Sequence, residues 1–310
     1  MSGTISHVSH RTLLFSVISA LVLALWSGCG ASRSSGLCET INLSEGEGDL
    51  AAAEAGADAA WLQRADEAQL TTAIAQWREA VRIAPEKTEN YVKLAKALYL
   101  WGDGFLRFQE KDEEMLKAFE EATFFAERAL KIQNPEFQMS VCSQEPFEKS
   151  VRLIRRQDIP AVYWYSVALG KYGLAKSIVI VLDNKDRIFA MMQHIRRLAP
   201  DYNHGASDRY LGAYFTKIPF PRGDLARSRQ HFERSIRRAP NYMATRVLMA
   251  QMLAPKLGDR ELFRTQLEHV INASDDVLPG MEPETAIEKR RARLLLDDID
   301  TIFVPEEEGE

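Results

Sequence analysis

Aromatic and cationic side chains gather in two short segments of this sequence, and together they have the chemistry of a ligand pocket. Aromatic rings bury apolar ligands, and phenol hydroxyls supply a few orienting hydrogen bonds. The aromatic candidates are Tyr163, Trp164, Tyr165, Tyr172, Tyr210 and Tyr214. Lys171 and Arg209 stand among these rings and could pair with a ligand carboxylate. A second interpretation stays open, because aromatic residues at helical spacing also fill cores and the two cations could be solvated or structural charges.

A catalytic site is hard to assemble from the same sequence. The histidines stand singly with no H-E-x-x-H pair, and there is no G-x-x-x-x-G-K, no G-x-S-x-G and no glycine-rich nucleotide fingerprint. The segment from His204 to Asp208 favours a turn and helix cap over a fragment of a catalytic triad. Asp183 to Asp186 favours a helix start, because it lacks the glycine and terminal glutamate of a calcium loop. We therefore expect no enzyme, no cofactor and no metal site.

An export signal precedes the folded part of the chain. Leu13 to Trp26 is apolar apart from two serines, and it is shorter than the roughly 20 residues that span a bilayer. Trp26-Ser27-Gly28-Cys29 then resembles the lipobox of bacterial lipoproteins, in which the cysteine is lipidated and becomes the new N-terminus. Trp26 departs from that pattern, which has an aliphatic residue there, and the alternative is ordinary signal-peptidase cleavage nearby. No aspartate follows Cys29, so by analogy with sorting in enteric bacteria an outer-membrane anchor is preferred over the inner membrane.

The domain organisation follows from these signals and from composition. We expect a signal peptide over 1–28, a flexible tether rich in Ser, Gly and Glu over 29–49, a helical domain over 50–304 and an acidic tail over 305–310.

Cys38 and Cys142 remain if Cys29 carries lipid. In an oxidising periplasm these two cysteines could form a disulfide that pins the tether to the loop after the helix ending near Ile132. They could equally stay unpaired, and scattered cysteines without a C-x-x-C make no zinc site.

The apolar spacing is helical almost throughout the folded part. The predicted helices span 50–66, 69–84, 88–105, 111–132, 158–181, 184–198, 206–216, 223–238, 241–255, 258–273 and 284–300. The β-branched run from Ser177 to Leu182 is expected to continue a helix. The residues from Asn134 to Asp158 are expected to be an insertion, either functional or simply mobile.

Four prolines mark a degenerate repeat. Pro85, Pro135, Pro200 and Pro240 each follow a helical run, and an aromatic residue soon restarts packing. Small residues such as Ala80, Ala122, Ala126 and Ala129 would let paired helices approach closely. The prolines are unevenly spaced, whereas regular tetratricopeptide repeats keep about 34 residues. The sequence therefore predicts an all-α fold, an irregular tetratricopeptide-like array of helical hairpins forming an α-α superhelix.

The charge balance argues against nucleic acid as a partner. The formal net charge is -5 at pH 7, so no basic surplus is available to neutralise phosphates. Local basic clusters have acidic residues nearby at helical spacing and are expected on solvated helix faces rather than in a binding patch; they are Arg152 with Arg155 and Arg156, and Lys289 to Arg291 with Arg293.

Several segments, in this order and spacing, are similar to the T-component family of tripartite ATP-independent periplasmic (TRAP) transporters. They are Ile159 to Tyr165, Gly170 to Gly173, Arg209 to Phe215 with Ile218-Pro219, Gly223-Asp224 with His231 to Glu233, Thr245 to Ala250, Asp259 to Phe263, and Ala286 to Leu295. The similarity runs from about 60 to 303, and the lipobox-like signal is also similar to the family. The Trp26 lipobox and the acidic tail depart from it.

The resemblance implies a periplasmic accessory that associates with a TRAP solute-binding protein, as a homotrimer with a hydrophobic channel in each subunit. Its ligand would be hydrophobic or an organic acid. The alternative hypothesis is a tetratricopeptide scaffold lipoprotein that binds peptides or proteins during envelope assembly.

Overall fold

The computed structural model describes residues 36–40, 43–219 and 221–304. The chain divides into two compact units, Met1–Ser34 and Ser35–Glu310, and the described residues all belong to the second. The expected signal peptide, the lipobox cysteine Cys29 and the acidic tail over 305–310 lie outside the described residues.

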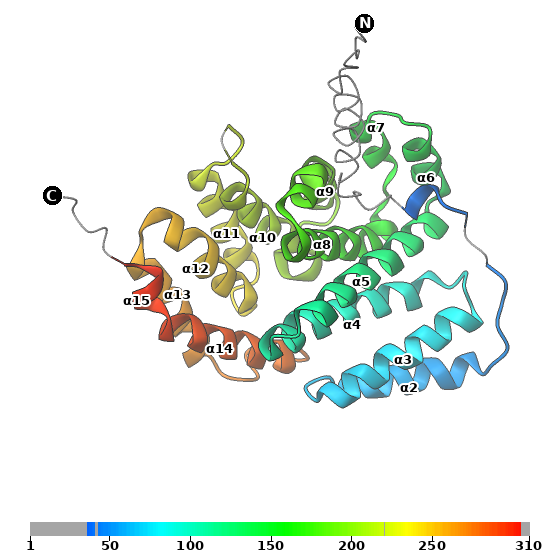
Figure 1. Ribbon diagram of the computed structural model, residues 1–310, viewed down its shortest axis with the longest axis horizontal. Helices are drawn as coiled ribbons and strands as arrows, with labels where there is room; N and C mark the ends of the chain where they lie inside the picture. Colours follow the sequence, from blue (N-terminus) through cyan, green and yellow to red (C-terminus); the bar gives the residue numbers. More distant parts are fainter. Residues whose placement is uncertain (1–35, 41–42, 220, 305–310) are drawn as a thin grey trace, which may run out of the picture. The chain divides into compact units, whose positions relative to one another are not determined.

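Within this described part, the chain forms α-helices and short 3-10 turns and contains no strand (Figure 1). The α-helices are α2 (Leu50–Leu62), α3 (Glu67–Ile83), α4 (Thr88–Gly104), α5 (Asp112–Gln133), α6 (Pro135–Cys142), α7 (Phe147–Ser150), α8 (Ile159–Lys176), α9 (Ile178–Leu198), α10 (Tyr202–Lys217), α11 (Leu225–Arg238), α12 (Ala244–Leu257), α13 (Arg260–Asn272), α14 (Glu282–Asp297) and α15 (Ile299–Ile302). The 3-10 turns are η1 (Gly36–Cys38), η2 (Leu106–Gln109), η3 (Val151–Leu153) and η4 (Arg156–Asp158). The predicted all-α class is confirmed.

Consecutive long helices pack on one another as hairpins. The pairs are α2 with α3, α4 with α5, α8 with α9, α10 with α11, and α12 with α13. Whether these hairpins are tetratricopeptide repeats stays a prediction.

Short acidic residues begin many of these helices, and prolines follow the ends of four. The side chains of Asp49, Asp66, Asp224 and Asp259 accept hydrogen bonds from backbone N–H groups of the first turn. Helices α3, α5, α9 and α11 end at residues 83, 133, 198 and 238, each just before one of the prolines at 85, 135, 200 and 240. The prolines therefore terminate helices as the sequence predicts.

The prediction of one continuous helix over 158–181 is wrong, because the helix is interrupted at Ser177. This residue has an extended backbone, with φ -172° and ψ 141°, and its side chain accepts a hydrogen bond from the Val179 N–H. It ends α8 and caps α9. The β-branched run therefore begins a new helix, and Asp183 to Asp186 lies inside α9 rather than at a helix start.

The insertion between Asn134 and Asp158 contains two α-helices, α6 and the short α7, that the sequence prediction missed. Asn134 ends α5, and its side chain then accepts a hydrogen bond from the Phe137 N–H to cap α6. Pro135 fits the first turn of α6, where no N–H is needed. The same Asn-Pro pair that stops one helix thus starts the next.

Small residues bring the paired helices close together. All four predicted spacers, Ala80, Ala122, Ala126 and Ala129, are fully buried. Gly212 of α10 lies against Phe232 of α11, where a Cβ would come within 2.8 Å of the ring. A large apolar core runs through α2 to α10, and a separate apolar cluster joins α12, α13 and α14.

The segment predicted as a tether contributes one element to the packed domain. In η1, Leu37 is fully buried, and Gln138 of α6 donates a hydrogen bond to its carbonyl. The structure joins Cys38 to Cys142 at the end of α6 as a disulfide, with Cα atoms 5.5 Å apart. None of the helices described here is long and apolar enough to cross a bilayer.

Candidate functional site

A pocket lies between the large core and the C-terminal helices, and we call it the central pocket. Its walls come from α4, α8, α10, α12 and α14, with Trp61 from α2 at one side. Its volume is about 150 Å³, enough for a small organic molecule or several waters. Leu100, Val247 and Ile287 supply part of an apolar lining. The pocket therefore joins helices that are far apart in the sequence.

Aromatic rings form one wall of the central pocket. Trp164 of α8 contacts Tyr163 beside it and Tyr99 of α4, with ring centroids 5.0 and 5.5 Å away. Tyr242, in the loop before α12, also lines the pocket and stacks on His204 at 4.7 Å. These rings present flat apolar faces with a few hydroxyl groups, which suits an apolar molecule with a polar head.

Arg209 places a buried positive charge in this aromatic setting. It is 7% exposed, and its guanidinium lies over the Tyr242 ring at 4.5 Å. It donates hydrogen bonds to the backbone carbonyls of Asn203 and His204, at 3.3 and 3.1 Å, and a long one to the Tyr163 hydroxyl at 3.4 Å. Among the described residues, no carboxylate forms an ion pair with Arg209. All three acceptors are neutral, so Arg209 has no ion-paired partner, and Glu288 acts on it only through space.

An unusual backbone turn sets the position of Arg209. Asn203, His204 and Gly205 all have left-handed conformations, with φ of 44°, 60° and 71°. Residues other than glycine adopt this region only singly and at an energetic cost, so the turn is strained and held by its surroundings. The backbone carbonyls of Asn203 and His204 in this turn accept the hydrogen bonds from Arg209. The sequence interpretation of a turn here is correct, but its role is to hold a pocket cation.

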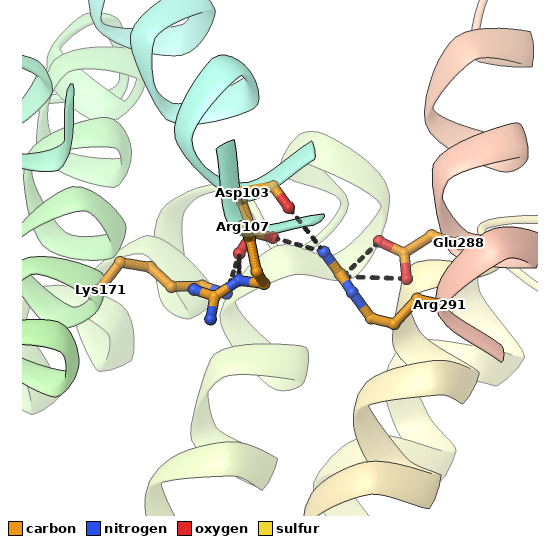
Figure 2. Close-up of polar contacts among 5 residues, drawn as sticks. All are labelled: Asp103, Arg107, Lys171, Glu288 and Arg291. Atoms are coloured by element: carbon orange, nitrogen blue, oxygen red, sulfur yellow. Dashed lines mark hydrogen bonds and ion pairs between the residues drawn. The ribbon is translucent and has the colours of Figure 1, made fainter. Parts of the chain in front are cut away.

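The other predicted cation, Lys171, has a carboxylate partner. Its ammonium lies 2.6 Å from Asp103 Oδ1 at the end of α4 (Figure 2). Arg107 contacts the same oxygen at 3.0 Å, and Arg291 of α14 contacts Oδ2 at 3.1 Å. Arg291 also donates to Glu288, at 2.9 and 3.1 Å. This ion network ties α4, α8 and α14 together, so Lys171 acts here as a structural charge.

Burial and neighbouring charges act in opposite directions on this network. Burial raises the pKa of Asp103, but Lys171, Arg291 and Arg107 outweigh it and hold that pKa well below its usual range. Burial raises the pKa of Glu288 above its usual value, and Arg291 only partly opposes this. Asp103 is therefore the fixed anion of the network.

A second pocket cation also stands without a carboxylate. The ammonium of Lys96, on α4, lies 4.7 Å from the centre of the Trp61 ring. It forms no ion pair within the part of the chain that the structure describes, and burial lowers its pKa. Arg64, on the other hand, is paired with Glu284 at 2.8 Å. Lys96 and Arg209 are thus the two lining cations that no side-chain carboxylate neutralises.

The comparison with protein families decides where this fold belongs. The model of the family described as TRAP transporter T-component matches residues 90–303, which is more than half of the chain. The chain belongs to the TRAP transporter T-component family. Among curated proteins, none matches it.

The part matched by the T-component family begins in α4 and ends just after α15. It contains every helix of the central pocket except α2, together with Arg209, Lys96 and the Asp103 network. The resemblance seen in the sequence is confirmed. Members of this family are accessory proteins of an envelope-associated transport system, and that role is the coarse function of this T-component.

The structure divides the eight predicted ligand residues of this T-component among five surroundings. Tyr163, Trp164, Lys171 and Arg209 line the central pocket. Tyr165 is buried in the large core, and Tyr172 packs in a small cluster around Phe119. Tyr210 lies beside Gly170, and Tyr214 lines a different groove described below. The helical geometry of α8 and α10 explains the division, because successive side chains point in different directions around a helix.

Other pocket residues of this T-component escaped the sequence analysis. Lys96, Tyr99, Asp103 and Tyr242 stand outside the aromatic segments, and no local motif marks them. The expectation that the basic cluster from Lys289 to Arg293 lies on a solvated face is wrong for two members. The side chains of Lys289 and Arg291 are only 10% and 14% exposed, because α14 turns them toward Asp275 and Asp103.

Proposed function

We propose that this T-component is a periplasmic protein, anchored by lipid on Cys29, that binds an organic acid in the central pocket. It exchanges this ligand with a TRAP solute-binding protein. Family membership supports the transport role, and the signal-like N-terminus supports export and anchoring. The homotrimer and the hydrophobic channel are further parts of the proposal that the family resemblance supports.

The observation that carries the ligand assignment is the unpaired charge of Arg209. Removing a guanidinium from water is costly unless an anion pairs with it, and here all the direct hydrogen-bond acceptors are neutral oxygens. Arginine presents a planar fork that matches a carboxylate with two parallel hydrogen bonds. A ligand carboxylate would supply the missing anion, with its apolar part against Trp164, Tyr163 and Tyr242.

Lys96, a second cation in the pocket lining, supports the same assignment. Burial lowers its pKa, and an anionic ligand would stabilise its charged form. The small pocket volume favours a compact acid over a folded peptide. This favours ligand binding over the alternative of a peptide-binding scaffold, which would use an open surface.

The test identifies what the protein carries when it is purified from a periplasmic extract. The protein is denatured after exhaustive washing, and the released small molecules are identified by mass spectrometry. We expect an organic acid from the native protein and about tenfold less or lower from Arg209→Gln, since a hydrogen bond to a charged group contributes about 1.5–3 kcal/mol.

Arg237→Gln is the matched control, because the Arg237 side chain is 68% exposed and does not line the pocket. It should release as much acid as the native protein. Equal release from Arg209→Gln and native protein, or binding of extended peptides in place of any acid, would contradict the proposal.

A further inference from the structure

A second concave site lies on the side of the domain formed by α7, η3, α9, α10 and the start of α11. It is larger than the central pocket, at about 700 Å³. Its floor is aromatic: Phe189 lies 4.7 Å from Tyr214 and 6.0 Å from Phe215, measured between ring centroids. Four arginines line it, namely Arg152, Arg197, Arg222 and Arg227. We call this site the arginine groove.

The groove has more positive charge than its own carboxylates neutralise. Asp186 pairs with Arg222, and the side chain of Asp224 caps α11 by accepting from the Arg227 N–H. Arg152, Arg197 and Arg227 form no ion pair with any described residue. Arg227 lies over the Phe215 ring at 4.6 Å, and Arg197 contacts the His194 ring nitrogen. Glu148 and Asp224 are the lining carboxylates without an ion pair, so three unpaired arginines face two unpaired acids and the groove keeps a net positive charge.

The packed η1 segment limits how far the groove can lie from an N-terminal anchor. Residues 36–38 are held by the buried Leu37 side chain and by the disulfide from Cys38 to Cys142. Only residues 29–35 separate Cys29 from this segment, and a fully extended chain of that length spans roughly 25 Å. A lipid on Cys29 would therefore hold the bilayer surface close to the end of α6.

The groove wall continues directly from this anchored end. Helix α6 ends at Cys142, and α7 and η3 follow it with Glu148, Val151 and Arg152 in the groove lining. The residues from 142 to 148 span at most about 20 Å. Helix α6 also packs against α7 and η3, and these in turn pack against α9 (Figure 1). If Cys29 carries the lipid anchor of the proposed function, the unpaired arginines lie at the end of the domain that this anchor holds near the membrane.

We propose that the arginine groove binds the anionic headgroup of a membrane phospholipid, so that the face formed by α7, α9 and α11 is turned toward the bilayer. The orientation rests on the lipid anchor of the proposed function. Guanidinium groups bind phosphate with paired, charge-assisted hydrogen bonds. The Phe189, Tyr214 and Phe215 rings cover the glycerol and the first methylene groups, as aromatic residues do at membrane interfaces. The short reach of the tether selects lipid over a soluble anion as the occupant.

The experiment measures sedimentation of the unlipidated mature chain, from residue 29 onward with Cys29→Ser, in its oxidised form. Vesicles of phosphatidylcholine alone are compared with vesicles that also contain phosphatidylglycerol. We expect binding only to the anionic vesicles, and a loss of at least about tenfold for the triple variant Arg152→Gln, Arg197→Gln, Arg227→Gln. Glu148→Gln should strengthen binding, because it removes the charge of a lining acid that pairs with no arginine.

The matched control removes three cations that form no ion pair elsewhere on the described surface: Lys117→Gln, Arg264→Gln, Arg293→Gln. This variant has the same net charge as the groove variant, and it should bind anionic vesicles as the native chain does. An equal loss in both triple variants, no binding to anionic vesicles, or binding of soluble glycerol phosphate without binding of vesicles would overturn the proposal. Thermal unfolding of each variant checks that the fold is retained.

The outcome separates the groove from the proposed transport role. Mass spectrometry of the full-length protein reports the lipid on Cys29, and small-molecule release reports the central pocket. One result would contradict the groove proposal alone: the native protein carries both the lipid and the acid, but its unlipidated form does not bind anionic vesicles. The opposite result would support the groove proposal and contradict the ligand assignment of the central pocket: the unlipidated chain binds anionic vesicles, but the native protein carries no acid.

Discussion

Lys171 and Arg209 are both cations beside aromatic rings, yet they have different roles because their partners differ. Asp103 lies 2.6 Å from Lys171 and neutralises it inside the protein. Arg209 is held by carbonyls of a left-handed turn and keeps its charge available. At the residue scale, a cation marks a ligand position only when the fold leaves it without an anion.

The Asp103 network predicts a large loss of stability in Asp103→Asn. The variant leaves the partly buried Lys171 ammonium and Arg291 guanidinium without this carboxylate, and breaking one side of a fully buried pair costs about 3–5 kcal/mol, so a loss near the lower end of that range is expected. Urea unfolding at neutral pH should show this loss relative to the native protein. A variant that unfolds at the native urea concentration would show that Asp103 is not the anchor of the network.

Asp103 also determines how the stability difference between the native protein and Asp103→Asn depends on pH. Asp103 has a pKa below its usual value in the folded state, so its contribution is fully present above the unfolded pKa of about 3.9. That contribution is lost as pH falls below this value, because the unfolded state takes up a proton first. The difference in unfolding free energy between the native protein and Asp103→Asn should therefore become smaller as the pH is lowered below about 4.

At the scale of elements, hairpin contacts depend on residues without side chains. Helices α10 and α11 approach at Gly212, which packs on the fully buried Phe232 ring. This contact places α10, and with it Arg209, at a set distance from α11. The site therefore depends on packing behind it as well as on the pocket lining.

Gly212→Ala should destabilise the domain. Its Cβ would lie 2.8–2.9 Å from ring atoms of Phe232, and overpacking of this kind costs about 1–3 kcal/mol. Gly56→Ala is the matched control: its Cβ would have no neighbour closer than 3.7 Å, and alanine is the better helix former by up to about 1 kcal/mol. Opposite shifts in thermal unfolding temperature are expected, and equal shifts would show that the α10–α11 contact relaxes freely.

At the scale of the whole described domain, one covalent link ties its beginning to its middle. Cys38 and Cys142 are 104 residues apart in sequence, and their disulfide restricts the unfolded chain over that length. The same link brings the tether to the end of α6, which decides the end of the domain that a lipid anchor would hold near the bilayer.

The double variant Cys38→Ser, Cys142→Ser should lose about 2–4 kcal/mol of unfolding free energy relative to the oxidised native protein. A reducing agent should lower the native stability by the same amount and leave the double variant unchanged. Peptide mapping before and after reduction detects the linked peptides directly. Two free thiols in the protein taken from the periplasm would contradict the link.

Local signals in the sequence determined most of the helical fold. Apolar spacing, acidic caps and the prolines at 85, 135, 200 and 240 act over one or two turns of chain, so they can be read without knowing the tertiary structure. The two errors in the helix prediction were also local. Ser177 interrupted a helix that was predicted to continue, and Asn134 ended α5 and capped the start of α6. A residue that can stop one helix and start another is ambiguous until neighbouring packing selects its backbone conformation.

Only the tertiary structure decided the sites. Arg209, Lys96 and Tyr242 lie on α10, on α4 and before α12, and nothing in their spacing shows that they line one pocket. Whether a charge is paired depends on carboxylates such as Asp103, which lies 68 residues from Lys171. The sequence specifies which side chains exist and which helices carry them, but long-range packing determines which charges are neutralised and which are left for a ligand.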